Sequence, residues 1–350
     1  MNRLLILNLS IDSKNTSLAF TQDWVNSLSN KYDFIDVLTL RLGKEFTINE
    51  NVTIHFVNKH NEKKSKIFQL FKLVKLSKSI VSQNDYSHCF AHMAPMQHLI
   101  IKPFLFRKKI KSTLWFTHSG PRFGLKWIIL LLSSFLANNL VTASKNSFPF
   151  KIKKRQYIGH GINTKSFFNK RVNFRLKKII VLSRISKSKN IDETLSSLLL
   201  ADNFNNLIID VVGGPLNEKD KVYLNYLNNK YSKYPNISFL GRKLHSELPE
   251  LLKKYDININ NAKEGFFDKS VLETVSAGLI NLYRSSDFDF LYSIKFVKYL
   301  KFNNQNLHQK INNLQKLDSE EVLLEINSSQ NFANDHSLEN ITNKLYKIFN

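Results

Sequence analysis

The first half of the chain alternates short apolar runs with amphipathic segments. Apolar runs at 3–9, 34–40 and 52–57 have the length and composition of buried strands, and "SHCFAHM", "STLWFTH" and "NLVTAS" repeat the pattern. Residues 65–83 place apolar side chains at three- and four-residue spacing with lysines opposite, which predicts an amphipathic helix. Another helix is expected around 18–31. Strands that alternate with helices in this way are typical of a parallel, doubly wound sheet.

The second half repeats this alternation. Strands are predicted at 177–185, 206–214 and 236–241 and in "ININNA", each followed by a helical segment. The chain has 350 residues, which suits two domains of roughly 150 residues each, and its 43% of hydrophobic residues can fill two cores. The predicted fold is therefore α/β, with two Rossmann-like domains, each a doubly wound parallel sheet, facing a cleft.

The domain boundaries follow from the same pattern. We expect an N-terminal domain at 1–168 and a C-terminal domain at 169–334, joined by a basic hinge near 165–176. Residues 335–350 predict a C-terminal helix that could pack back on the N-terminal domain.

The formal net charge is +23, from 51 Lys and Arg against 28 Asp and Glu. This charge indicates an anionic partner, such as a phosphorylated ligand, an anionic membrane surface or nucleic acid. Nucleic acid is not the expected partner, because no single element concentrates basic and aromatic residues into a binding platform. Cys89 is the single cysteine, so no intrachain disulfide can form, which fits a reducing compartment such as the cytoplasm.

The longest apolar stretch, "WIILLLSSFLANNLV" at 127–141, is shorter than the ~20 residues that span a bilayer. The favoured interpretation is a buried helix that leads into a strand. The alternative is a helix at a membrane interface, helped by Lys126 and the basic run at 107–111. The apolar run near the N-terminus is expected to be a strand and not a signal peptide, because no small-residue cleavage site follows it.

Ligands of open α/β sheets bind beyond the carboxyl ends of the strands, so the loops there are the candidates for chemistry. In "SRISKSKN", Arg184 and Lys189 could clamp a diphosphate, the arginine as a planar fork and the lysine as a mobile charge. In "VVGGP", Gly213 and Gly214 would let the backbone approach a ligand closely. The alternatives are a solvated basic loop and an ordinary turn.

The stretch "EGFFDKSVLETVSAG" at 264–278 is the most informative. A helix that begins near Lys269 would direct free N–H groups and the positive end of its dipole at a phosphate. Glu273, about one turn inside that helix, could accept hydrogen bonds from ribose hydroxyls. Glu273 could equally be a polar residue on a surface helix.

Three histidines lie at positions suited to chemistry. His118 and His92 end predicted strands, where an imidazole could bond a sugar hydroxyl or transfer a proton. His160 lies between two glycines just before the hinge. A structural role is the alternative for each.

No metal site is expected. The acidic triplet "DFD" at 287–289 resembles a metal-binding motif of another transferase fold, but here it predicts a helix N-terminus with acids in the first turn. No other His, Cys or carboxylate cluster has the spacing of metal ligands.

In their order and spacing, "VLSRISKSKN", "VVGGP", "ISFLGR…ELPELLKKYDININNA" and "GFFDKSVLETVSAG" resemble the C-terminal domain of the family-4 retaining glycosyltransferases of the GT-B fold, the "glycosyl transferases group 1" type. "WFTHSG", "NLVTAS" and "IGHGINTKSF" resemble the N-terminal domain and linker of that family. The resemblance covers most of the chain.

The resemblance implies that a sugar moves from a nucleotide sugar, linked to UDP, GDP or ADP, to a glycan or lipid-linked acceptor with its configuration retained. It implies no cofactor and no metal, because Arg184 and Lys189 would hold the diphosphate and stabilise the leaving group. It implies that Glu273 holds the ribose and that Gly213 lies beside the nucleotide. His118 resembles the histidine that this family places near the transferred sugar.

Two departures from the family pattern stand out. The glycine-rich loop that usually follows the first strand is missing from "SIDSKNTSLAF". The first glutamate of the family's pair should fall at Gly265, but Glu264 is one residue early. With a glycine there, backbone N–H groups and the charges of Asp268 and Lys269 are expected to meet the sugar and phosphates.

The leading hypothesis is a cytoplasmic enzyme of envelope polysaccharide or lipopolysaccharide synthesis, with a basic surface suited to the inner face of an anionic membrane. A sugar-nucleotide epimerase on the same fold is one alternative, and it would form product without an acceptor. A non-catalytic basic binding protein is the other, and it would bind nucleic acid in a salt-sensitive way without affinity for a sugar nucleotide.

Overall fold

The structure is a computed structural model that describes residues 2–14, 18–60, 62, 64–118, 120, 123–303 and 305–350. The chain forms two compact units, Met1–Gly161 with Leu338–Asn350, and Ile162–Ser337. We call these the first and second units. The sequence "SIDSKNTSLAF", which lacks the family's glycines, falls partly outside the described residues, at 15–17.

The first unit is built on a seven-stranded sheet in the order β3-β2-β1-β4-β5-β6-β7, with every pairing parallel. Its strands are β1 (Arg3–Ile11), β2 (Phe34–Leu42), β3 (Val52–Lys59), β4 (His88–His92), β5 (Lys111–Trp115), β6 (Asn139–Thr142) and β7 (Arg155–Tyr157). Its helices are α1 (Thr21–Ser29), α2 (Lys66–Gln83), α3 (Pro95–Arg107), α4 (Leu125–Leu136) and α13 (Leu338–Phe349).

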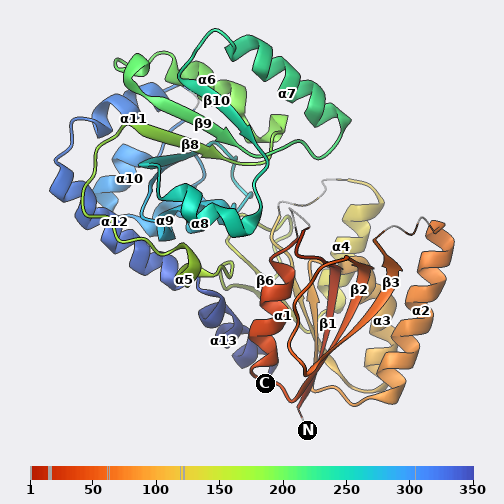
Figure 1. The fold of residues 1–350 in the computed structure, drawn as a ribbon. Helices are drawn as coiled ribbons and strands as arrows, with labels where there is room; N and C mark the ends of the chain where they lie inside the picture. Colours follow the sequence, from red (N-terminus) through yellow and green to blue (C-terminus); the bar gives the residue numbers. More distant parts are fainter. Residues whose placement is uncertain are drawn as a thin grey trace. The chain divides into compact units, whose positions relative to one another are not determined.

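Alternate residues of β1 enter two separate cores. Leu5 and Leu7 pack in the core beneath α2, α3 and α4, while Leu4 and Ile6 pack in the core beneath α1 and α13. A strand buried on both faces is expected where helices cover both sides of a parallel sheet. Figure 1 shows the helices on the two sides of this sheet.

The second unit has a five-stranded parallel sheet in the order β10-β9-β8-β11-β12. Its strands are β8 (Lys178–Leu182), β9 (Ile208–Val212), β10 (Ile237–Gly241), β11 (Ile257–Asn260) and β12 (Ile280–Tyr283). Its α-helices are α5 (Thr164–Phe167), α6 (Ile191–Leu198), α7 (Glu218–Tyr231), α8 (Leu248–Leu252), α9 (Lys269–Ser276), α10 (Ile294–Leu300), α11 (Leu307–Leu314) and α12 (Ser319–Asn334). The short 3-10 helices are η1 (Lys187–Lys189), η2 (Phe204–Asn206), η3 (His245–Glu247) and η4 (Ser286–Leu291).

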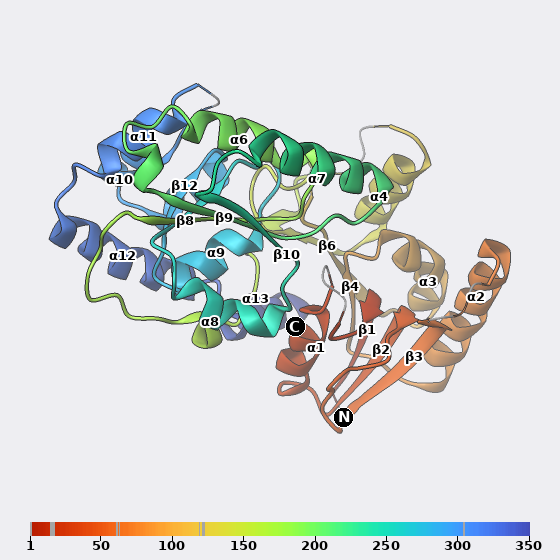
Figure 2. The ribbon, with the colours of Figure 1, turned by 45° about the horizontal axis from the view of Figure 1, so that its top comes forward.

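Helices cover both faces of this second sheet, with α6 and α7 on one side and α8 and α9 on the other (Figures 1 and 2). The prediction of two doubly wound parallel sheets is therefore confirmed. Side-chain caps fix several helix starts: Asn217 accepts from the N–H of Asp220 at α7, and Asp318 accepts from Glu320 and Glu321 at α12.

The stretch at 127–141 differs from the favoured interpretation. It forms α4 and then β6, as expected, but α4 is buried on one side only. Leu130, Ser133 and Ser134 are buried, while Leu125 and Phe135 are 73% and 62% exposed. Among the described residues, no helix has both the length and the apolar character needed to cross a bilayer.

Candidate functional site

Three loops of the second unit meet at the carboxyl edge of its sheet, where β9, β8 and β11 are neighbours. The loop after β8 is held to the loop after β9, since the N–H of Ser183 donates to Val212 O at 3.0 Å and that of Ile185 to Gly214 O at 3.1 Å. The same β8 loop is held to the β11 loop, since Asn190 Nδ2 donates to Asn261 O at 2.8 Å. Parallel strands bring their carboxyl ends to one edge, so these loops form one surface.

Gly213 allows the closest of these approaches. Its φ is +150°, and a Cβ placed on it would lie 1.8 Å from the carbonyl oxygen of Ser183. Gly214 has only the Arg242 side chain near its own Cβ position, at 3.2 Å. The first glycine is therefore required by the packing of the two loops, whatever ligand the second unit binds.

Lys189 and Asp268 form an ion pair between the end of η1 and the residue that precedes α9. Asn260 Nδ2 also donates to the Asp268 carboxylate at 3.1 Å, and the Lys189 ammonium lies 5.9 Å from the centre of the Phe266 ring. Burial alone would raise the pKa of Asp268, but Lys189 and Asn260 outweigh it, so the pKa lies below the ordinary value. Asp268 is thus a carboxylate at neutral pH.

Glu273 is the most enclosed charge of the site, with 3% of its side chain exposed. Its Oε1 lies 3.2 Å from Lys269 Nζ, one turn earlier on α9, and accepts a hydrogen bond from His245 Nε2 at 2.9 Å. Burial alone would raise the pKa of Glu273, but the charge of Lys269 and the bond from His245 lower it to about 2. The helix begins at Lys269, as predicted.

His245 is a site residue that the sequence analysis did not single out. It lies on η3, after β10, and its ring packs edge-on against Phe167 with a centroid distance of 5.5 Å. No local motif marks it, because its partner Glu273 is 28 residues away.

Glu264 is turned toward η4. Its carboxylate accepts from the N–H of Ser286 at 2.7 Å and from the hydroxyls of Ser285 and Ser286 at 3.1 and 3.0 Å. Gly265 has φ +86°, and its N–H donates to Asp287 Oδ2 at 3.2 Å. These contacts attach the loop before α9 to η4.

The acidic triplet at 287–289 lies at the start of a short helix, as the sequence predicted. Residues 287–289 lie in η4, whose first turn is capped by Ser285, and Asp289 pairs with Lys301 at 2.8 Å. Within the described residues, no group of three or more His, Cys, Asp or Glu side chains could hold a metal ion.

Arg184 is exposed, and its guanidinium has no hydrogen bond or ion pair to any described residue. It follows β8 directly, in the same loop as Lys189. The structure therefore brings Arg184, Lys189, Gly213, Gly214 and the 265–273 segment to one edge of one sheet.

The three candidate histidines, His92, His118 and His160, belong to the first unit. His118 is exposed just beyond β5, with its ring 6.1 Å from that of Phe116. His92 and His160 are buried among Trp24 and Trp115, with His92 4.8 Å from the Trp24 ring and 4.7 Å from the Trp115 ring. Burial lowers the pKa of His92 to about 3, so it is neutral and packs as a core residue.

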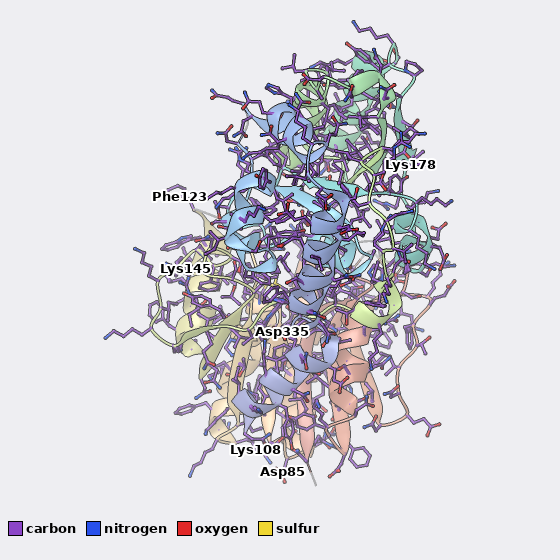
Figure 3. The ribbon with its side chains drawn as sticks, turned by 90° about the vertical axis from the view of Figure 1, so that its left-hand side faces the viewer. Asp85, Lys108, Phe123, Lys145, Lys178 and Asp335 are labelled. Atoms are coloured by element: carbon purple, nitrogen blue, oxygen red, sulfur yellow. The ribbon has the colours of Figure 1, made fainter. Side chains whose placement is uncertain are left out.

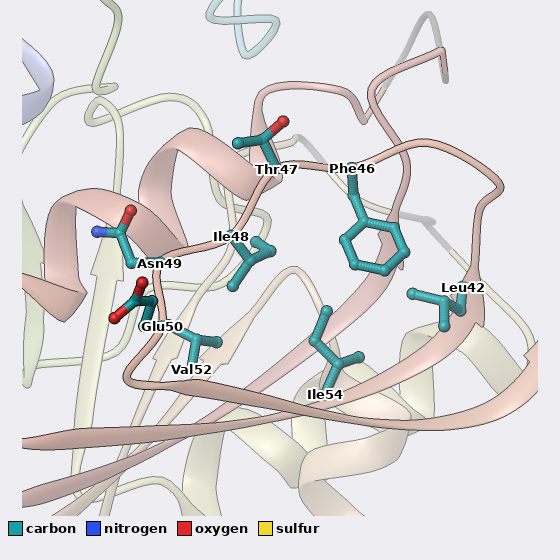
Figure 4. Close-up of a pocket in the computed structure, with 8 residues that line it drawn as sticks. All are labelled: Leu42, Phe46, Thr47, Ile48, Asn49, Glu50, Val52 and Ile54. Carbon is teal, nitrogen blue, oxygen red and sulfur yellow. The ribbon is translucent and has the colours of Figure 1, made fainter.

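A shallow groove of about 580 Å³ also lies in the first unit, between the 46–50 loop and the edge strand β3. Figure 4 shows the Phe46, Ile48 and Ile54 side chains around it. Its lining is mostly apolar and includes none of the candidate residues, so it adds nothing to the site at the second sheet.

Searches of family models and of curated proteins found no match to this chain. Solved structures do match over nearly the whole chain. HepE of Anabaena, in complex with UDP and glucose, has a TM-score of 0.73 at 13% identity, and the match covers 99% of both chains. Sucrose-phosphate synthase of Thermosynechococcus elongatus has a TM-score of 0.77 at 11% identity, covering 100% of this chain and 98% of that one.

The chain has the GT-B fold. A glycosyltransferase of Rickettsia africae matches equally well, with a TM-score of 0.73 at 14% identity, covering 99% of this chain and 98% of that one. The site described above lies at the carboxyl edge of the second sheet of this fold, whose strands span residues 178–283.

Proposed function

We propose that the protein is a glycosyltransferase that moves a sugar from a nucleotide-sugar donor to a glycan or lipid-linked acceptor. One observation carries the proposal: Arg184, which has no side-chain partner among the described residues, shares the carboxyl edge of one parallel sheet with Lys189 and the buried carboxylate of Glu273. Cations next to a carboxylate suit a diphosphate joined to a ribose, whose hydroxyls are donors.

In this proposal Arg184 and Lys189 hold the diphosphate and stabilise the charge that develops on it as the sugar leaves. Glu273 accepts the ribose hydroxyls, and Asp268, Lys269 and the backbone at Gly265 meet the sugar and phosphates. These roles need no metal ion, because two protein cations supply the positive charge. Among the similar structures named above, one is a sucrose-phosphate synthase, one is a glycosyltransferase, and one was solved in complex with UDP and glucose.

His118 is proposed to lie near the transferred sugar, which is expected to keep its anomeric configuration. The pathway is proposed to be the synthesis of an envelope polysaccharide or lipopolysaccharide. The location is proposed to be the cytoplasm, at the inner face of the membrane.

The test is a thermal-shift screen against UDP-, GDP- and ADP-sugars, followed by an assay of nucleotide release with and without acceptor extracts. UDP-glucose is the first donor to test. We expect the unfolding midpoint to rise with one nucleotide class and nucleotide release to require an acceptor and to survive EDTA. Product without an acceptor would indicate an epimerase, and no effect of any sugar nucleotide would overturn the proposal.

A further inference from the structure

Helix α4 turns a broad apolar stripe outward, while its inward side buries two serines beside Leu130. Its outward stripe consists of large apolar residues, all exposed: Leu125, Ile128, Leu132, Phe135 and Leu136. Its inward side buries Ser133 and Ser134 completely. At 100° per residue the five apolar positions fall within about 100° of the helix circumference, which is the width of the stripe that normally faces a core. We call this stripe the α4 face.

The orientation of α4 is fixed by its buried hydroxyls. Ser133 Oγ is 2.8 Å from Nδ1 of the buried His98, and Ser134 Oγ donates to Leu130 O at 2.6 Å. Rotating the helix to bury its leucines would expose these serines and leave His98 Nδ1 without a partner, at a cost of about 1–3 kcal/mol for that group. The protein therefore holds the apolar stripe outward by specific contacts.

Exposed lysines lie on α4 and on the segment beside it. Lys126 is exposed on α4 itself. The 148–154 segment runs along the helix, because Phe150 contacts Trp127 with ring centroids 5.4 Å apart and Lys154 Nζ donates to Phe135 O at 2.8 Å. The lysines between these two anchor points, Lys151 and Lys153, are exposed.

A second exposed apolar stripe lies on the same layer of helices. Ile67 and Phe71 of α2 are 82% and 70% exposed, with Lys75 and Lys78 exposed on the same helix. Helix α3 packs against both α2 and α4, which places the two stripes on one layer (Figures 1 and 2). Because each helix returns antiparallel to the strand before it, the first turns of α2 and α4 lie near the carboxyl edge of the first sheet.

The segment before α4 extends this surface. Phe123 is 89% exposed, and Figure 3 shows it with Lys145 along one outer edge of the first unit. An aromatic side chain that projects beside lysines is typical of elements that lie in a membrane interface.

We propose that the α4 face inserts into the interface of a bilayer that contains anionic phospholipid, with Lys126, Lys151 and Lys153 on the headgroups. The charge pattern favours this occupant over a second copy, because two chains of net charge +23 would bring lysine rims together. It also favours a bilayer over a neutral apolar partner, since polybasic rims are drawn to anionic lipid. The inference concerns the first unit alone and does not depend on catalysis.

The experiment is flotation of the full chain with phosphatidylcholine vesicles that contain or lack phosphatidylglycerol. We expect binding only to the phosphatidylglycerol vesicles, weakened by salt. The double variant Leu132→Ser, Phe135→Ser should bind roughly tenfold or more weakly, because two inserted apolar side chains are lost. The matched control is Leu324→Ser, Phe332→Ser on α12, which also replaces two exposed apolar residues and should float like the wild type.

A third variant, Lys126→Glu, Lys151→Glu, Lys153→Glu, should lose the preference for phosphatidylglycerol. Both α4-side variants should keep the unfolding midpoint, since every changed side chain is exposed. They should also keep UDP affinity, which separates this test from that of the proposed function. The proposal would be overturned if the wild type did not bind anionic vesicles, or if the Leu132→Ser, Phe135→Ser variant bound them as well as the wild type. It would also be overturned if light scattering showed a dimer that this double change dissociates.

Discussion

Lys189 Nζ pairs with the carboxylate of Asp268, and this pair joins the loop after β8 to the N-terminus of α9. The ammonium that is proposed to meet a diphosphate is therefore already neutralised by the protein. A diphosphate has to compete with Asp268 for Lys189, or Asp268 has to turn to the sugar when the donor binds.

The change Asp268→Asn separates these roles. It removes the competing charge, so we expect UDP to bind about fivefold more tightly, equivalent to about 1 kcal/mol. Turnover of the nucleotide sugar should fall, because the proposed contact of Asp268 with the sugar is weakened. Isothermal titration with UDP and a nucleotide-release assay measure the two effects.

The control for this change is Asp85→Asn, which breaks the ion pair of Asp85 with Lys108 in the first unit and should alter neither quantity. Weaker UDP binding by Asp268→Asn would show that Asp268 orders Lys189 for the ligand and does not compete with it.

Arg184 offers a cleaner test of diphosphate binding. Its guanidinium has no partner among the described residues, so Arg184→Ala should leave the unfolding midpoint of the free protein unchanged. UDP affinity should fall about tenfold or more, the loss expected from hydrogen bonds to a charged group. Lys187→Ala removes a cation from the same loop and is the control. Equal losses from both variants would indicate general attraction to a basic loop and not a specific clamp.

The ionised state of Glu273 predicts a pH dependence of stability. Its pKa is about 2 in the folded protein against 4.5 ordinarily, so its contribution is present above pH 4.5 and is lost as the pH falls toward 2. The shift corresponds to about 3 kcal/mol in the free energy of unfolding. Glu273→Gln should therefore be destabilising at pH 7, and its difference from the wild type should shrink below pH 4.5.

Urea unfolding at several pH values between 7 and 3 measures this difference. Glu321→Gln, which breaks the surface pair with Lys295, should show a small effect at every pH. A Glu273→Gln difference that stays constant down to pH 3 would contradict the depressed pKa.

Gly213 and Gly214, which follow β9, should differ in how well they tolerate substitution by alanine. Gly213→Ala would force a Cβ onto the Ser183 carbonyl oxygen at a positive φ, so we expect a loss of about 3 kcal/mol or more in the free energy of unfolding. A Cβ at Gly214 would lie 3.2 Å from side-chain atoms of Arg242, without a positive φ, so Gly214→Ala should cost less than about 1 kcal/mol. Urea unfolding compares the two, and equal effects would contradict the close approach of the β8 and β9 loops.

Much of the fold could be predicted from the sequence because strand and helix periodicity is local. The runs at 3–9, 34–40 and 52–57 lie inside β1, β2 and β3, and the start of α9 at Lys269 follows from the pattern before it. The loops that carry Arg184 and Lys189 could be located for the same reason, since each follows a strand.

What could not be predicted depends on partners distant in the chain. The apolar content of α4 led to the prediction that this helix is buried. Its orientation is set instead by the contact of Ser133 with His98, which lies 35 residues earlier in the chain. His245 reaches Glu273 from another loop, with no motif around it. The position of Glu264 likewise depends on two serines that follow it by 21 and 22 residues.

Substitutions of Glu264 and Glu273 should have different effects on UDP binding. Both glutamates lie on one segment, but their carboxylates have different partners. Glu264 is bound by Ser285 and Ser286 of the η4 start, whereas Glu273 faces His245 and is proposed to hold the ribose. We expect Glu273→Ala to weaken UDP binding about tenfold or more. Glu264→Ala should change it far less but should lower the unfolding midpoint, because the hydrogen bonds to Ser285 and Ser286 are lost. Titration with UDP and thermal unfolding of both variants decide this, and equal loss of affinity would show that Glu264 also belongs to the nucleotide site.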